Sequence, residues 1–206
     1  MDALIDFKYG TYLAKGKDSI VYLSEDELSV IKVYDKLINN LRINTLENCL
    51  NVIQTYANDT LLAAKIIESN WKNVPKEVRK INYEGKKYDL SIKIIPQGKA
   101  QILNNSVVSI GQKYLSCDSL AHYFVDSGHP ELMAKLINAN EDEIDEGILY
   151  SSKLINRNVL PSFSIVFVNI KPILNESEQK LDLIVTDLAN NLIRNYLISA
   201  KEGYLY

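Results

Sequence analysis

The sequence predicts an α+β protein with a β-rich first lobe and a second lobe that is mostly helical and contains a β-hairpin. Residues 11–34 combine β-rich segments with a glycine turn, residues 43–57 repeat apolar residues at helical spacing, and β-propensity returns over 163–187. We therefore expect a single bilobal domain, with lobes at 1–115 and 116–206 and a link near residues 113–118.

The segment TYLAKGKDSIVYLSEDELSVIKVY (11–34) predicts three short strands, with Gly16 at the first turn. Lys32 lies among branched apolar residues in the third strand. Burying a lysine is costly unless its ammonium finds a partner, and a phosphate beneath a glycine turn is one such partner. Two structural alternatives remain open: Lys32 extends to solvent from an edge strand, and Gly16 belongs to an ordinary hairpin turn.

The rest of the first lobe is predicted to contain two helices and two strands. In residues 43–57 the apolar side chains recur at helical spacing, with Thr45 or Asn44 as the capping residue. Asn58 and Asp59 are expected to end this helix before a second one. The further expectations are a helix over 60–70, a polar surface excursion over 71–87, strands over 88–96 and 106–115, and turns at Gly98 and at Asn104-Asn105.

The second lobe begins with helical patterns and returns to strands. Amphipathic stretches predict helices over 118–124, 130–137 and 141–158. The last of these has acids at its start and bases near its end, as the helix dipole favours. Segments 163–174 and 181–187 predict a hairpin, and the tail over 189–206 is ambiguous between strand and helix.

Composition narrows the class of protein. The chain has 206 residues, of which 47% are hydrophobic, and this share is enough for a core. The net charge of −3, with acids and bases interspersed, argues against a nucleic-acid-binding protein. Cys49 and Cys117 form no CxxC motif, which argues against structural zinc or a disulfide framework. Neither a secretory signal nor a long apolar run is visible, so we expect a cytoplasmic protein without a membrane span.

The order of these motifs resembles the eukaryotic-type protein kinase fold in a reduced form. LAKGKDSIVY (13–22) is similar to the glycine-rich loop that covers ATP phosphates, with Gly16 as the retained glycine. SVIKVY (29–34) is similar to the strand that carries the phosphate-binding lysine, here Lys32. The resemblance makes Glu47, on the following helix, the ion-pair partner of Lys32, with Glu68 as a fallback.

The resemblance also implies an adenine-binding hinge and a metal-binding segment. IGQKYLSCDSL (110–120) is similar to the last strand and hinge, where Lys113, Tyr114 and Leu115 would offer backbone groups to adenine. LIVTDLAN (183–190) is similar to the DFG segment, with Asp187 as the magnesium ligand, aided by Asn169 or Asn175. The implied ligands are ATP and Mg²⁺.

Several departures from the kinase pattern concern catalysis. Ala14 and Ser19 stand where the outer glycines usually lie, and Leu188 and Ala189 replace the Phe and Gly of DFG. No HRD motif precedes the hairpin. If residues 169–172 (NIKP) align with the family's D-x-K-P, Asn169 replaces the catalytic Asp. If Asn169 instead aligns with the metal-binding Asn, no Asp stands at the base position.

Both alignments leave the general base missing, because an amide cannot accept the substrate's proton as a carboxylate does. The segment after Asp187 is also too short for an activation loop and a peptide-binding platform. Asp187 and Asn169 remain the catalytic and metal-binding candidates. Their structural alternatives are a turn-forming Asp at a strand end and a core amide with satisfied hydrogen bonds.

Three functions are compatible with these residues. The first is a nucleotide-binding pseudokinase with little or no phosphotransfer. The second is a non-enzymatic protein-interaction module on the same scaffold, in which Lys32 and Glu47 form a structural ion pair. The third is an active minimal kinase that uses an unconventional base.

Overall fold

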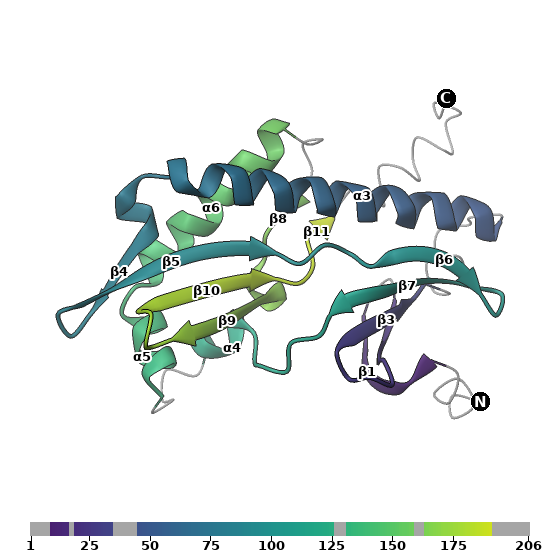
Figure 1. Ribbon diagram of the computed structural model, residues 1–206, viewed down its shortest axis with the longest axis horizontal. Coiled ribbons are helices and arrows are strands. Elements are labelled where there is room, and N and C mark those ends of the chain that lie inside the picture. Colours follow the sequence, from purple (N-terminus) through teal and green to yellow (C-terminus); the bar gives the residue numbers. More distant parts are fainter. Residues whose placement is uncertain (1–8, 17–18, 35–44, 126–130, 159–162, 191–206) are drawn as a thin grey trace. The chain divides into compact units, whose positions relative to one another are not determined.

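A computed structural model gives the architecture of the chain (Figure 1). The ranges that the structure describes are 9–16, 19–34, 45–125, 131–158 and 163–190. These residues contain a five-stranded sheet, a four-stranded sheet, a two-stranded ribbon and four α-helices, which confirms the α+β class. The backbone contacts divide into two compact units. The described residues of unit 1 lie within 9–59 and 96–115, and those of unit 2 within 60–95 and 116–190.

The sheet of unit 1 is antiparallel, with the strand order β1-β2-β3-β7-β6. Its strands are β1 (Thr11–Lys15), β2 (Ile20–Leu23), β3 (Ser29–Val33), β6 (Lys99–Leu103) and β7 (Ser106–Lys113). The three strands predicted within 11–34 and the strand predicted over 106–115 are confirmed. The sequence did not predict β6, because only Ala100 of this edge strand is buried and no alternating pattern results. Asn104 and Asn105, both with positive φ, form the predicted turn between β6 and β7.

Both faces of this sheet are covered by apolar side chains. On one face, Cys49 and Ile53 of helix α3 pack against Tyr34, Ala100 and Val107. The opposite face has a second cluster, made of Tyr9, Tyr22, Val33 and Val108. Successive residues of β3 point to opposite faces, so Lys32 lies on the same face as Tyr34, which α3 covers.

Helix α3 (Leu46–Asn70) is one continuous helix, so the predicted break at Asn58-Asp59 is wrong. Neither residue is a strong helix breaker, and each costs only about 0.7 kcal/mol relative to alanine. Burial of the helix's apolar face outweighs that cost, since Ile53, Ala63 and Ile67 are each no more than 1% exposed. The predicted cap at Thr45 is confirmed, because its hydroxyl accepts the Asn48 N–H at 3.2 Å.

The sheet of unit 2 has the order β4-β5-β10-β9. Its strands are β4 (Lys80–Tyr83), β5 (Lys86–Ile94), β9 (Ile170–Asn175) and β10 (Lys180–Val185). The predicted hairpin is confirmed as β9 and β10, but its first strand begins at Ile170, and residues 163–169 of the predicted strand lie outside this sheet. Strands β5 and β10 pair in parallel although they are far apart in sequence. The strand predicted over 88–96 therefore belongs to this second sheet, and residues 60–95, which the sequence assigns to the first lobe, lie in unit 2.

The polar stretch 71–87 is more regular than the surface excursion predicted for it. It forms two short 3-10 helices, η1 (Trp71–Asn73) and η2 (Lys76–Arg79), then β4 and the start of β5. Strand β4 escaped prediction because it has a single buried side chain, Ile81. Glu84 and Gly85, both with positive φ, form the turn into β5.

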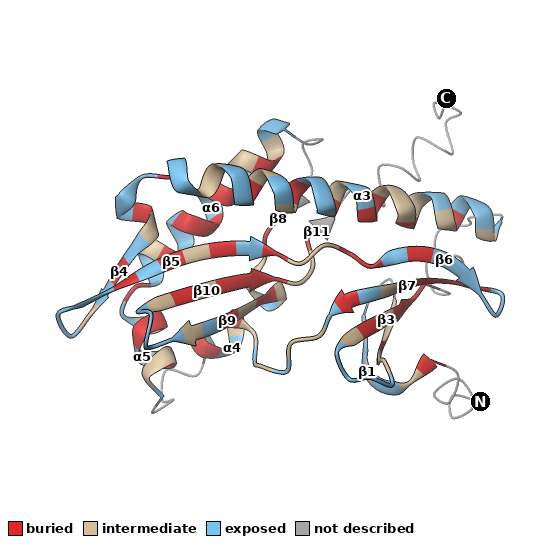
Figure 2. Ribbon diagram, in the orientation of Figure 1, coloured by how far each residue is buried: buried red, intermediate tan, exposed pale blue. Residues whose placement is uncertain are grey.

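The remaining elements of unit 2 are mainly helical. They are α4 (Leu120–Val125), α5 (Leu132–Asn138), α6 (Glu141–Asn158), β8 (Phe163–Ser164), η3 (Phe167–Asn169) and β11 (Ala189–Asn190). The bounds of α6 match the predicted 141–158. Helix α6 packs on β5 at Gly147, where a Cβ would make ordinary van der Waals contacts with Leu90 at 3.4 Å and Ile92 at 3.6 Å, so this packing does not require glycine. Figure 2 shows that buried residues are concentrated along β10.

Some predictions concern residues outside the described ranges. These are the alternative cap Asn44, the start of the 130–137 helix at Pro130, and the tail beyond Asn190. Over the residues that the structure does describe, no helix is both long enough and apolar enough to cross a bilayer.

Candidate functional site

Lys32 belongs to a buried polar cluster in unit 1. It is 7% exposed, and its ammonium donates a hydrogen bond to Gln97 Oε1 at 3.0 Å. The Gln97 amide nitrogen in turn donates to the hydroxyl oxygens of Tyr34 and Ser109, the latter at 2.8 Å. Ser109 donates to the Gly98 carbonyl at 3.1 Å, so the four side chains form a connected network.

Strand register and one close backbone approach build this cluster. Lys32 pairs directly with Ser109 across β3 and β7. A Cβ at residue 98 would lie 2.3 Å from the Ile110 carbonyl oxygen, so only glycine fits there. Gly98 therefore allows the chain to pass against β7 and to place Gln97 within hydrogen-bond distance of Lys32.

The glycine turn and the two glutamates predicted to act with Lys32 lie in different environments. Gly16 is in the β1–β2 turn, is exposed, and donates its N–H to Ser19 O at 2.8 Å. Glu47 is exposed in the first turn of α3, and no ion pair joins it to Lys32 among the residues described. Glu68, the fallback partner, is on the part of α3 that belongs to unit 2.

The predicted hinge residues follow β7. Lys113 is exposed at the end of that strand and pairs with Ser29. The Tyr114 N–H donates to the Leu28 carbonyl at 2.9 Å, so this backbone donor is engaged within the sheet. Leu115 is half-buried and is the last residue of its segment of unit 1.

At the open end of the β9–β10 hairpin in unit 2, Asn169 lies beside Thr186, the residue before Asp187. The Asn169 carbonyl accepts hydrogen bonds from the Thr186 N–H at 2.8 Å and from its hydroxyl at 3.0 Å. Asp187 is the next residue, and its side chain and that of Asn169 are both half-buried. Carboxylate and amide oxygens are both ligand types that Mg²⁺ accepts.

Asn175 is not placed to assist them. It lies at the opposite end of β9, about 20 Å along the strand from Asn169. Its side-chain oxygen accepts hydrogen bonds from Ser177 and from the Glu178 N–H within the hairpin turn. Nowhere in the described ranges do three or more His, Cys, Asp or Glu side chains form a metal-binding group, so a metal at Asp187 would depend on amide, water or ligand oxygens.

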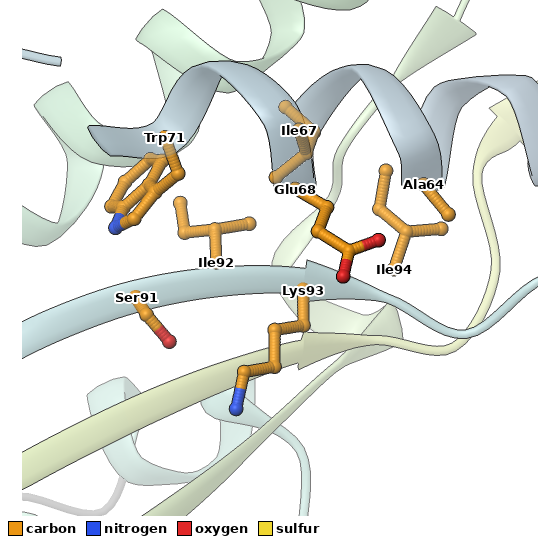
Figure 3. Close-up of a pocket in the computed structure, with 8 residues that line it drawn as sticks. All are labelled: Ala64, Ile67, Glu68, Trp71, Ser91, Ile92, Lys93 and Ile94. Carbon is orange, nitrogen blue, oxygen red and sulfur yellow. The ribbon is translucent and has the colours of Figure 1, made fainter. Parts of the chain in front are cut away.

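Unit 2 also contains a pocket that sequence reasoning missed. It lies between α3 and β5 and has a volume of about 340 Å³ (Figure 3). Four residues of the helical segment and four of β5 line it, among them Glu68, Trp71 and Lys93. Single-sequence patterns could not reveal it, because its two walls come from elements separated by η1, η2 and β4.

Beside this pocket, β5 and β10 share a charged cluster. Asp182 accepts hydrogen bonds from Ser91 and from Lys93, the latter at 2.6 Å, and Lys180 lies 3.5 Å away. Burial opposes ionisation of Asp182, but the hydrogen bonds from Lys93 and Ser91 outweigh burial and hold its pKa below the ordinary value.

Comparison with known proteins adds no family assignment. No protein-family model matches the chain, and a search of the curated proteins found no significant match.

Proposed function

We propose that this chain is a kinase-fold, nucleotide-binding protein of the pseudokinase type, with little or no phosphotransfer activity. The observation that carries the proposal is the position of Lys32. It is a buried lysine on the strand after the Gly16 hairpin, and it lies on the sheet face covered by the following helix. A buried ammonium that donates to a neutral amide gains a stronger partner when a phosphate oxygen binds it.

The order of elements in unit 1 supports this proposal. A strand, a glycine turn, a second strand and a lysine strand are followed by a helix and by two further strands of the same sheet. The kinase resemblance predicts such an order up to the hinge, although it assigned the strand over 88–96 to this sheet, where the structure has β6 instead. In unit 2, a long helix followed by a hairpin with Asp187 after its last strand continues that order.

The residues at the hairpin end define what chemistry is available. Asp187 and Asn169 supply one carboxylate and one amide oxygen, which suits a magnesium ion that keeps waters and nucleotide phosphates as its other ligands. Asn169 cannot act as a general base. Binding of ATP and Mg²⁺ without efficient transfer is therefore the expected activity.

Nucleotide binding is tested by following the thermal unfolding of the full chain while ATP and MgCl₂ are titrated. We expect saturable stabilisation, by about 2.7 kcal/mol at a ligand concentration one hundred times Kd. Lys32→Met keeps the length and apolar stem of the side chain and should abolish the stabilisation. The matched control is Lys99→Met, an exposed lysine in the same sheet, which should respond like the wild type.

A second variant tests the magnesium-binding part of the proposal separately from the nucleotide-binding part. Asp187→Asn should weaken binding of the Mg²⁺ complex while leaving metal-free ATP binding unchanged. The proposal fails if millimolar ATP with Mg²⁺ gives no stabilisation, or if Lys32→Met binds as the wild type does. Transfer of radiolabelled phosphate that is lost in Asp187→Asn would instead support an active minimal kinase.

A second candidate function, a protein-interaction module on the same scaffold, is favoured by the hydrogen bonds already made in unit 1. The Lys32 ammonium is held by Gln97, and the Tyr114 N–H is engaged by Leu28. A stoichiometric protein partner, identified by affinity capture from the native host and reconstituted with purified components, would favour this candidate if nucleotide binding is absent.

A further inference from the structure

The pocket between α3 and β5 has apolar walls and the size of a small-ligand site. Ala64 and Ile67 contribute from the helix, and Ile92 and Ile94 from the strand (Figure 3). A volume of about 340 Å³ is near the lower end of the range for small-molecule sites. The walls therefore suit a compact ligand with an apolar body.

Glu68 is the charged group that faces this space. Its carboxylate points from α3 toward β5 (Figure 3). It is exposed and makes no hydrogen bond or ion pair with any residue that the structure describes. Lys65 and Lys72 lie about one turn away along the chain, yet neither forms an ion pair with it in the described part of the chain.

The pocket's own lysine does not neutralise Glu68. Lys93 lines the space, and its ammonium binds Asp182 at 2.6 Å. Lys180 lies 3.5 Å from the same carboxylate, so Asp182 has two cationic neighbours. A ligand entering the pocket therefore meets one negative charge that is not paired with a cation in the described part of the chain.

Trp71 adds an aromatic surface at one end of the pocket. Its indole N–H donates to the Leu90 carbonyl at 3.1 Å, which fixes the orientation of the ring. The face of a tryptophan ring attracts organic cations more strongly than that of any other side chain. A carboxylate, an aromatic ring and apolar walls in one small space together favour a cationic ligand over a neutral or anionic one.

We propose that this pocket binds a small organic ammonium ion with an apolar body. The ammonium group pairs with the Glu68 carboxylate, and the apolar part packs on the half-buried side chains of Ala64 and Trp71. The proposal is independent of nucleotide binding, because none of these residues belongs to the Lys32 cluster or to the hairpin end.

The chain contains a single tryptophan, so tryptophan fluorescence reports on the pocket directly. The probes are 3-phenylpropylamine, which is cationic at neutral pH, the neutral 3-phenylpropanol and the anionic 3-phenylpropanoate. They share one apolar body and differ mainly in charge. We expect the amine to bind most tightly, the alcohol more weakly and the carboxylate most weakly.

Two variants of the full chain test the roles of the residues. Glu68→Gln should weaken amine binding by about two- to fivefold and leave alcohol binding unchanged, as expected for an exposed ion pair. The matched control Glu146→Gln, an exposed carboxylate on α6, should bind the amine like the wild type. Ala64→Leu should fill the pocket and weaken all three probes, while thermal unfolding verifies that the variant is folded.

The inference is overturned if the carboxylate binds as tightly as the amine, or if Glu68→Gln leaves amine binding unchanged. It is equally overturned if no probe alters the tryptophan signal at millimolar concentration.

Discussion

The side chain of Asn140 connects the edge strand β4 to the junction between α5 and α6. It is 3% exposed and makes three hydrogen bonds. Its oxygen accepts the Asn82 N–H at 2.9 Å, and its nitrogen donates to the carbonyls of Asn82 at 3.0 Å and Leu136 at 2.8 Å. Asn140→Ala removes all three bonds and leaves those three backbone groups without this partner.

The expected loss of stability follows from these contacts. A neutral hydrogen bond contributes about 1 kcal/mol net, so three bonds set a scale of about 3 kcal/mol. Because Asn82 is on an exposed edge strand, water can solvate part of what is lost. We therefore expect Asn140→Ala to lower the free energy of unfolding by about 2 kcal/mol, measured by urea denaturation.

A local measurement and a matched control make this prediction specific. Hydrogen exchange of the Asn82 N–H should accelerate in Asn140→Ala, since its acceptor is gone. The control is Asn158→Ala, which removes an exposed bond of 2.8 Å from Asn158 to the Leu154 carbonyl and should change stability by less than about 0.5 kcal/mol. The reasoning is refuted if both variants lose equal stability or if exchange at Asn82 is unchanged.

Three further variants test other parts of the fold. Gly98→Ala should lower the free energy of unfolding in urea by more than about 2 kcal/mol, because its Cβ would collide with a backbone carbonyl. The control Gly16→Ala should lower it much less, since the nearest atom to its Cβ would be 3.3 Å away. Equal losses in the two variants would contradict this reasoning. Folding lowers the pKa of Asp182, so its carboxylate stabilises the folded protein fully at pH values above the unfolded pKa. This stabilisation is lost as the pH falls through the folded pKa. Asp182→Asn should therefore be less stable than the wild type at neutral pH, and the difference should shrink in denaturation curves recorded at acidic pH; a constant difference would argue against the ion cluster. Asn58→Ala, at an exposed position inside α3, should raise the thermal midpoint through a gain of about 0.5 kcal/mol, and a loss would indicate that the helix is interrupted there.

Local sequence patterns predicted some contacts of the candidate site residues and missed others. The apolar neighbours of Lys32 predicted a lysine in a strand, and the structure buries it there. Its partner Gln97 was not predicted, because it is 65 residues away and outside any periodic segment. The position of Asn169 beside Thr186, the residue before Asp187, by contrast follows from the hairpin register.

The amino-acid sequence by itself determined the elements whose signals are local. These are the strand–turn–strand start, the cap at Thr45, the span of α6 and the β9–β10 hairpin, each fixed by propensity, capping or periodicity within a short window. Only the tertiary structure decided that α3 runs unbroken, that β5 pairs in parallel with β10, and that a pocket with Glu68 and Trp71 lies beside β5. These outcomes depend on apolar surface buried between segments far apart in the chain, and that burial outweighs the weaker local preferences.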